Sequence, residues 1–293
     1  MGWQIGLMCA RAGYQVRQTD VRPEALESAR ERQRATLGEW SANGELGRLK
    51  ATGEPTEAVM ARLDYTTSLD EAARAADMAI EAATERLEIK RRIFAELSRI
   101  TRPDAILATN SSSIISRHLA DVVANPGRLC NFHFCNHPWL RPYVETMTCG
   151  QTTEEVLETC QRVGRSLGIA SAMVHGEVQG FIHNNVWRQI KKAAMTLVDE
   201  GHASVEDVDR AVMIGLRCPL GPFQMMDRAG LDVMLEIERQ WHAESGDPRD
   251  RPPKVLEELV ARGDLGVKSG RGFYSYPNPA FERPGWLFGQ DEE

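Results

Sequence analysis

A histidine and a glutamate in neighbouring segments are the residues of this chain best suited to proton transfer. His133 lies near the end of one predicted strand, 128–134, and Glu145 lies in the next, 143–148. Side chains on neighbouring strands can meet. A carboxylate bound to an imidazole fixes its tautomer and stabilises the imidazolium, as a general base near neutral pH requires. The pair therefore indicates acid–base catalysis, but a purely structural His–Glu pair would produce the same pattern.

The segments that must position this pair alternate between strands and helices. From residue 1 to residue 177, short β-branched runs predict strands at 14–20, 78–83, 105–110, 128–134, 143–148 and 171–175. Between them lie helical patterns such as 85–100, where Leu87, Phe94 and Leu97 share a face. This alternation is typical of βαβ units. We therefore expect an α/β domain over 1–177, with a doubly wound Rossmann-type sheet and an inserted helical hairpin near 23–63.

Helical patterns replace strand patterns after residue 177. Apolar residues recur every three or four positions at Ile182, Val186, Ile190, Ala193 and Leu197. Ser204 and Asp207 then have the spacing of a capped helix start. The second domain, 178–293, is therefore predicted to be all-helical.

Composition excludes several classes of protein. The chain has 293 residues, of which 42% are hydrophobic and 26% charged, as in ordinary globular proteins. Its net charge of -7 argues against a nucleic-acid partner. No apolar run approaches the roughly 20 residues that cross a membrane. The six cysteines form no CxxC pair, the N-terminus lacks a secretory signal, and His133 and His137 have no third metal ligand at a set spacing. We expect a cytoplasmic protein without a bound metal.

Four further motifs accompany the His–Glu pair along the chain. They are Asn110-Ser-Ser112-Ser113, Gly180-Phe-Ile-His-Asn184, Pro219-Leu-Gly-Pro222-Phe223 and Gly266-Val-Lys-Ser-Gly-Arg-Gly-Phe-Tyr274. In order and spacing, over essentially the whole chain, the set resembles the 3-hydroxyacyl-CoA dehydrogenase family. The tail motif that ends at Tyr274 is the most specific single signal.

The resemblance implies an active site made of His133, Glu145, Ser112 and Asn184. His133 would remove the proton from the 3-hydroxyl of the substrate, and Glu145 would orient His133 and offset its charge. Ser112 and Asn184 would hydrogen-bond the substrate oxygen. The implied reaction is oxidation of a 3-hydroxyacyl-CoA in fatty acid metabolism, with hydride transfer to NAD.

Residues for the cofactor are found near the strand ends. Asp20 closes the predicted strand 14–20, 18 positions after Gly2, where Rossmann folds place the carboxylate that binds the ribose. A carboxylate there repels a 2′-phosphate, so NAD is favoured over NADP. Glu85, Lys90 and Asn110 match family positions near the cofactor. Glu85 and Lys90 would also fit a surface ion pair on a helix.

The substrate and the assembly are less defined by the residues. The loop His137-Pro138-Trp139 departs from the usual acyl-CoA pattern and resembles a related branch that oxidises free 3-hydroxy acids. The alternatives to a CoA thioester substrate are therefore a free 3-hydroxy acid and a catalytically silent relative. We expect a homodimer formed through the helical domain, where apolar residues recur at Met225, Met226, Leu231 and Leu235. The same residues could instead fill the core of a monomer.

The beginning of the chain matches only part of the family's dinucleotide-binding fingerprint. Family members begin with a strand that leads into G-x-G-x-M-G, and Met1-Gly2 matches only the closing Met-Gly. We therefore expect a Rossmann-type sheet whose first strand is missing. We also expect Met1 to be an internal methionine of a natural protein that is longer by about ten to fifteen residues.

Overall fold

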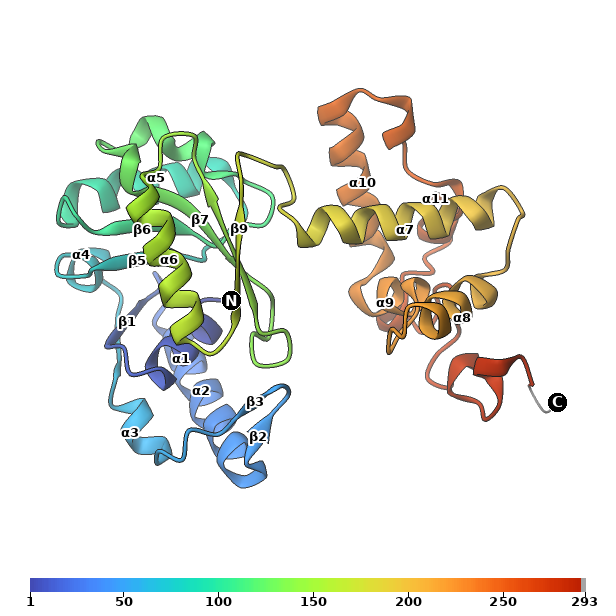
Figure 1. Cartoon of the computed structure of the whole chain (residues 1–293), viewed down its shortest axis with the longest axis horizontal. Helices are drawn as coiled ribbons and strands as arrows, with labels where there is room; N and C mark the ends of the chain where they lie inside the picture. Colours follow the sequence, from blue (N-terminus) through green and yellow to red (C-terminus); the bar gives the residue numbers. More distant parts are fainter. Residues whose placement is uncertain (291–293) are drawn as a thin grey trace. The chain divides into compact units, whose positions relative to one another are not determined.

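The structure is a computed structural model in which residues 1–290 are described. The chain divides into two compact units, Met1–Ile182 and His183–Glu293 (Figure 1). Within residues 1–290, the named strands all lie in the first unit, and the second contains helices, turns and isolated β-bridges. The predicted combination of an α/β part and a helical part is confirmed.

A five-stranded sheet forms the centre of the first unit, with its strands in chain order. They are β5 (Met78–Glu81), β6 (Ile106–Thr109), β7 (Leu129–Phe134), β8 (Tyr143–Thr148) and β9 (Ala170–Val174). Strands β5, β6 and β7 are parallel, β8 is antiparallel to β7, and β9 is parallel to β8. Every residue of β6 and β7 is buried, as is usual for strands covered on both faces.

A second, two-stranded parallel sheet is made of β1 (Val16–Thr19) and β4 (Leu63–Thr66). The sequence does not predict β4, because only Leu63 in this short strand is fully buried and its other residues are partly or fully exposed. Within residues 1–290, β1 and β4 pair only with each other, and β5 is an edge strand of the larger sheet. One edge of β1 and one edge of β5 are therefore unpaired.

Helices pack on these sheets through their apolar faces. α5 (Leu87–Ile100) buries Phe94, Leu97 and Ile100 in a cluster that includes Leu107 of β6. On α6 (Glu154–Ser166), Leu157 and Cys160 join the core with residues of β7. The other helices of this unit are α1 (Gly2–Arg11), α4 (Leu69–Ala73) and the 3₁₀ helices η1 (Ser116–Val122) and η2 (Pro126–Arg128).

The segment predicted as a helical hairpin contains only one long helix. α2 (Pro23–Asn43) ends at Gly44, which adopts the left-handed conformation with φ 71°. A short β-hairpin, β2 (Glu45–Leu46) and β3 (Leu49–Lys50), and the five-residue α3 (Thr56–Met60) follow in place of a second long helix. The reason is a tertiary contact: the backbone N–H of Arg48 donates to the carbonyl of Trp139 at 2.9 Å.

The second unit is a helical cluster. Its helices are α7 (His183–Asp199), α8 (Val205–Gly215), α9 (Pro222–Ala229), α10 (Leu231–Ser245) and α11 (Lys254–Ala261), with the 3₁₀ helices η3 (Pro248–Asp250), η4 (Val267–Ser269), η5 (Ala280–Glu282) and η6 (Trp286–Phe288). As the sequence predicts, the Ser204 side chain caps α8 by accepting from the Asp207 N–H. No helix in residues 1–290 is long and apolar enough to cross a membrane.

One expectation about the apolar residues of this unit is wrong. Met226, Leu231 and Leu235, which were expected at a dimer surface, are buried in the unit's own core. The apolar residues whose spacing predicts α7 are largely exposed, with Val186 at 56% and Leu197 at 42%. The buried face of α7 instead includes Arg188 and Lys191, whose charges are balanced by acidic groups from other helices.

Candidate active site

His133 and Glu145 face each other across the antiparallel pair β7 and β8. They are direct partners in the strand register, and His133 Nδ1 lies 3.1 Å from Glu145 Oε2. Glu145 is completely buried and His133 is 7% exposed. The imidazole also stacks on Phe181, with ring centroids 4.7 Å apart. When Nδ1 donates its proton to the carboxylate, Nε2 has the lone pair that a general base needs.

The second carboxylate oxygen of Glu145 also accepts hydrogen bonds. The Tyr143 hydroxyl donates to Oε1 at 3.2 Å, and the backbone N–H of Ile182 donates to it at 2.9 Å. Hydrogen bonds to a buried carboxylate favour its ionised form. Tyr143 was not identified from the sequence. Its position two residues before Glu145 on a predicted strand, and therefore on the same face, is the signal that could have identified it.

Asn110 links β6 to the strand that carries His133. Its backbone N–H donates to the carbonyl of Glu81 at 2.8 Å, and its side-chain oxygen accepts from the backbone N–H of Phe134 at 2.9 Å. Phe134 directly follows His133. Asn110 is 8% exposed, so it fixes the backbone next to the imidazole from inside the sheet.

Ser112 is the exposed member of a run of three serines after β6. Both of its neighbours bind Glu85: the Ser111 hydroxyl donates to Oε1, and Ser113 donates through its backbone N–H at 3.1 Å and its hydroxyl at 2.7 Å. Burial opposes ionisation of Glu85, but these hydrogen bonds and the charge of Lys90 lower its pKa to about 2. Glu85 is therefore an ionised anchor that holds the loop carrying Ser112.

Lys90 lies on the buried face of α5, where it pairs with Glu81 of β5, and not on an exposed helix surface. Its ammonium lies 2.8 and 3.1 Å from the two carboxylate oxygens of Glu81 and 3.2 Å from Glu85. Glu81 also accepts from the Thr109 hydroxyl at 2.7 Å and from the Ala83 N–H at 2.6 Å. Glu81 was not identified from the sequence, although a charged residue within the apolar run 78–83 marks it as unusual.

Gly2 and Asp20, two of the residues expected to hold NAD, lie near the carboxyl ends of β5 and β1. A Cβ at Gly2 would lie 3.9 Å from Cβ of Ala82, so the start of α1 adjoins the carboxyl end of β5. The first turn of α1 has no acidic residue and no side-chain cap, which suits a helix end that receives a diphosphate. Asp20 follows β1 and accepts from the Arg22 N–H at 2.9 Å, while its side chain remains 41% exposed. An exposed carboxylate there is compatible with binding ribose hydroxyls.

Asn184 belongs to the second unit, where it is the second residue of α7 and is half-buried. One turn later, Arg188 Nη2 lies 3.1 Å from Glu238 Oε2 and 2.8 Å from Asp250 Oδ1. The guanidinium also lies over the ring of Trp241, 4.5 Å from its centroid. These contacts anchor the beginning of α7 to α10 and η3, and so hold the helix that carries Asn184.

The tail motif around Gly266–Tyr274 has a structural role. The Asp227 carboxylate accepts from the backbone N–H groups of Phe273 and Tyr274, at 3.0 and 2.9 Å. The Tyr274 hydroxyl donates to Asp209 at 2.8 Å. A Cβ at Gly272 would lie 2.1 Å from Asp227 Oδ1, so only glycine fits there. Two buried carboxylates thus tie the tail to α8 and α9.

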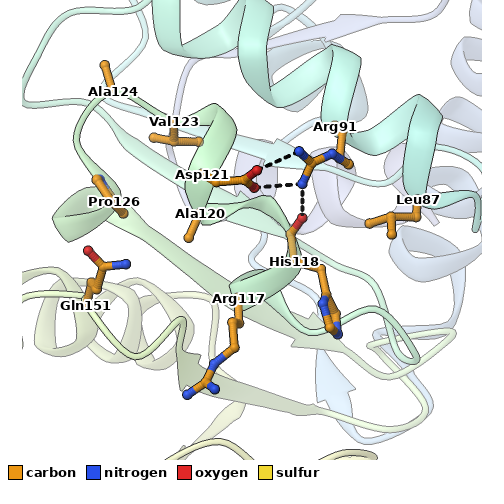
Figure 2. A pocket seen from close by; sticks show the side chains of 10 residues that line it. All are labelled: Leu87, Arg91, Arg117, His118, Ala120, Asp121, Val123, Ala124, Pro126 and Gln151. Carbon is orange, nitrogen blue, oxygen red and sulfur yellow. Dashed lines mark hydrogen bonds and ion pairs between the residues drawn. The ribbon is translucent and has the colours of Figure 1, made fainter. Parts of the chain in front are cut away.

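An open hollow of about 710 Å³ lies elsewhere on the first unit, between α5 and η1 (Figure 2). It contains none of the residues expected at the active site. Arg91 is directed at Asp121 and at the carbonyl of His118, at 2.6 to 2.7 Å, so its guanidinium is already bound. In the part of the chain described, no group of three or more His, Cys, Asp or Glu side chains could hold a metal ion.

Comparison with known proteins agrees with these features. Residues 1–178 match the 3-hydroxyacyl-CoA dehydrogenase NAD binding domain, and residues 180–276 match the C-terminal domain of the same family. A probable 3-hydroxybutyryl-CoA dehydrogenase of Bacillus subtilis is 34% identical over 276 residues, which cover 94% of both chains. The 3-hydroxyadipyl-CoA dehydrogenase of Escherichia coli is 35% identical over 94% of this chain and 57% of that protein.

A solved structure is similar along almost the whole chain. The crystal structure of (S)-3-hydroxybutyryl-CoA dehydrogenase from Ralstonia eutropha is 30% identical, covers 95% of this chain and 96% of its own, and superposes with a TM-score of 0.87. The matched family models together span both units. The chain therefore belongs to the 3-hydroxyacyl-CoA dehydrogenase family of NAD-dependent oxidoreductases.

Proposed function

We propose that this protein oxidises the 3-hydroxyl of a 3-hydroxyacyl-CoA to the 3-oxo group, with His133 as the general base. The observation that carries the proposal is the buried His133–Glu145 pair, with Nδ1 directed at the carboxylate at 3.1 Å. His133 Nε2 would accept the hydroxyl proton, and Glu145 would stabilise the resulting imidazolium. NAD, when bound, supplies the acceptor for the hydride that leaves C3.

The other expected site residues would position the reacting groups. Ser112 and Asn184 would hydrogen-bond the substrate oxygen and stabilise the charge that develops on it. Gly2 would admit the cofactor diphosphate to the end of α1, and Asp20 would bind the ribose. Glu85, Lys90 and Asn110 would shape the cofactor side of the site, because they hold the ends of β5 and β6 in place.

A CoA thioester with a short acyl chain is the proposed substrate. It is supported by the relatives named 3-hydroxybutyryl-CoA dehydrogenase, which match along almost their whole length. The loop 137–139, which departs from the usual acyl-CoA pattern, gives little support to a free 3-hydroxy acid as the substrate. Trp139 is 5% exposed and packs against Trp3 and Trp40, with ring centroids 5.7 and 6.4 Å away. Packing against the insertion therefore accounts for the tryptophan.

The experiment is an assay of the purified protein with NAD. It would compare 3-hydroxybutyryl-CoA, longer 3-hydroxyacyl-CoA thioesters, 3-hydroxyadipyl-CoA and free 3-hydroxybutyrate, with NADH formation as the readout. Because the CoA portion supplies binding energy remote from the reacting carbon, kcat/KM should be at least about a hundredfold higher for the thioesters. Turnover of free acids alone would favour the second candidate. Folded protein that turns over none of them would indicate a silent relative.

The proposed assembly is a homodimer related by a two-fold axis, the commonest closed symmetry. Apolar side chains of the second unit remain exposed in the single chain, at Val186, Leu197, Ile214 and Leu216. Covering them with a second copy would remove apolar surface from water. Sedimentation should give twice the chain mass of 32.7 kDa, and a clean monomer at micromolar concentration would refute the dimer.

A further inference from the structure

Tyr143 joins the His133–Glu145 pair as a third member. Its hydroxyl donates to Glu145 Oε1 at 3.2 Å, whereas His133 binds the other oxygen, Oε2, at 3.1 Å. Residues two apart on a strand share a face, so β8 places Tyr143 on the same face as Glu145, which pairs with His133 on β7. The backbone N–H of Ile182 at 2.9 Å is a further donor to Oε1.

Tyr143 remains a hydrogen-bond donor over the whole working pH range. Burial raises the pKa of its phenol to about 12, together with the nearby charge of Glu145, the hydrogen bond to it, and Cys135. Burial also raises the pKa of the Cys135 thiol. The charge of Glu145 adds to this rise, and the charge of Arg141 opposes it. Glu145 and Cys135 are thus ionisable groups that act on Tyr143, and a phenol that stays neutral donates to the carboxylate.

The donors on Oε1 described above limit how strongly Glu145 attracts a proton on His133. A hydrogen bond to a carboxylate withdraws part of its negative charge, so less remains to stabilise an imidazolium on the opposite oxygen. We propose that Tyr143 is a positioning residue that holds Glu145 and sets the pH above which His133 acts as a base. The proposal rests on the proposed function, in which His133 is the base.

The test is the pH dependence of kcat/KM in Tyr143→Phe, which keeps the ring and removes only the hydroxyl. The pH at the midpoint of the acidic limb should rise by about 0.5 to 1, because Glu145 then stabilises the imidazolium more strongly. On the acidic side the variant should lose about three- to tenfold in kcat/KM and recover at higher pH. Tyr14→Phe is the matched control, since it removes a hydroxyl hydrogen-bonded to Ser166 at 2.8 Å.

A second measurement does not depend on turnover. In the free protein, the His133 imidazole signal, assigned by its loss in His133→Gln, should titrate at a higher pH in Tyr143→Phe than in wild type. In a Glu145→Gln background, Tyr143→Phe should leave that midpoint unchanged, because Tyr143 acts through Glu145. An unchanged or lower midpoint in the single variant, or an equal shift in the Glu145→Gln background, would overturn the proposal.

The failure of this proposal is distinguishable from failure of the proposed function. If His133→Gln keeps wild-type turnover, His133 is not the base and the proposed function is wrong, whatever the Tyr143 variant does. If His133→Gln is inactive while Tyr143→Phe leaves the midpoint in place, only the role of Tyr143 is wrong. A loss of rate at every pH without a shift would mean that Tyr143 has only a packing role.

Discussion

Lys90 on α5 donates to both carboxylate oxygens of Glu81 on β5, at 2.8 and 3.1 Å, with both side chains almost completely shielded from solvent. A buried ion pair of this kind contributes little net stability, but removing one partner leaves an uncompensated charge. The remaining hydrogen bonds of Glu81, from Thr109 and Ala83, cannot replace the lost ammonium.

Lys90→Met should therefore lower the free energy of unfolding by about 3–5 kcal/mol. Adding Glu81→Gln should restore part of the loss, because the buried charge is then also removed. Denaturant titration measures both effects. Arg102→Met is the control, since its ion pairs with Asp77 and Asp104 are exposed and should be worth less than about 1 kcal/mol. Equal effects of Lys90→Met and Arg102→Met would contradict the prediction.

His133→Gln should slow the catalytic step by about 10²–10⁴, the usual contribution of a positioned general base. Glutamine retains polarity but cannot accept the proton near neutral pH, and NAD affinity should hardly change. Steady-state kinetics at saturating substrate and NAD titration measure the two quantities. His118→Gln, an exposed histidine of the same unit, should leave both unchanged. Turnover close to wild type in His133→Gln would rule out the assigned base.

Asp20→Asn should change the cofactor preference. The carboxylate accepts hydrogen bonds from ribose hydroxyls and repels a 2′-phosphate, and hydrogen bonds to charged groups are worth about 1.5–3 kcal/mol. We expect kcat/KM with NAD to fall by about tenfold or more, and the ratio of NADP to NAD activity to rise. Asp64→Asn, on the paired strand β4, should not alter that ratio. An unchanged ratio of NADP to NAD activity in Asp20→Asn would mean that the ribose binds at another residue.

Asp209 should make the stability of the second unit depend on pH. Burial raises the pKa of this carboxyl from 3.8 to about 6, despite hydrogen bonds from Phe223, Tyr274 and Gln224 that oppose the rise. The folded protein holds the proton on Asp209 more tightly than the unfolded chain does. The contribution of Asp209 to the free energy of unfolding is therefore full below about pH 4 and is lost as the pH rises through about 6. The difference between these two pKa values corresponds to about 3 kcal/mol of stability.

The measurement is the free energy of unfolding of wild type minus that of Asp209→Asn between pH 4 and pH 7. This difference should fall as the pH rises, because asparagine does not titrate. Asp207→Asn, an exposed change on the same helix, should remain parallel to wild type over this range. A difference that stays constant with pH for Asp209→Asn would show that Asp209 does not titrate there.

Much of the fold and the core of the site can be predicted from local patterns. The alternation of strands and helices up to residue 177 predicts the α/β unit, because the period of apolar residues reflects which faces are buried. His133 and Glu145 fall in consecutive predicted strands, and these pair in register. The spaced motifs indicate the family, because their order along the chain can be recognised without knowledge of the fold.

Other features depend on partners that only the tertiary structure brings together. Arg188 and Lys191 lie on the buried face of α7 because acidic groups on α10 and η3 balance their charges, and hydrophobic periodicity contains no information about such pairs. From the sequence, Lys90 is typical of an exposed helix residue. In the structure it is buried on α5 because it pairs with Glu81 of β5, nine positions earlier. The second long helix near residue 50 is replaced by a hairpin that pairs with Trp139. In each case the free energy of a polar group is decided by whether tertiary packing supplies its partner, and the periodicity of apolar residues along the chain does not reveal that partner.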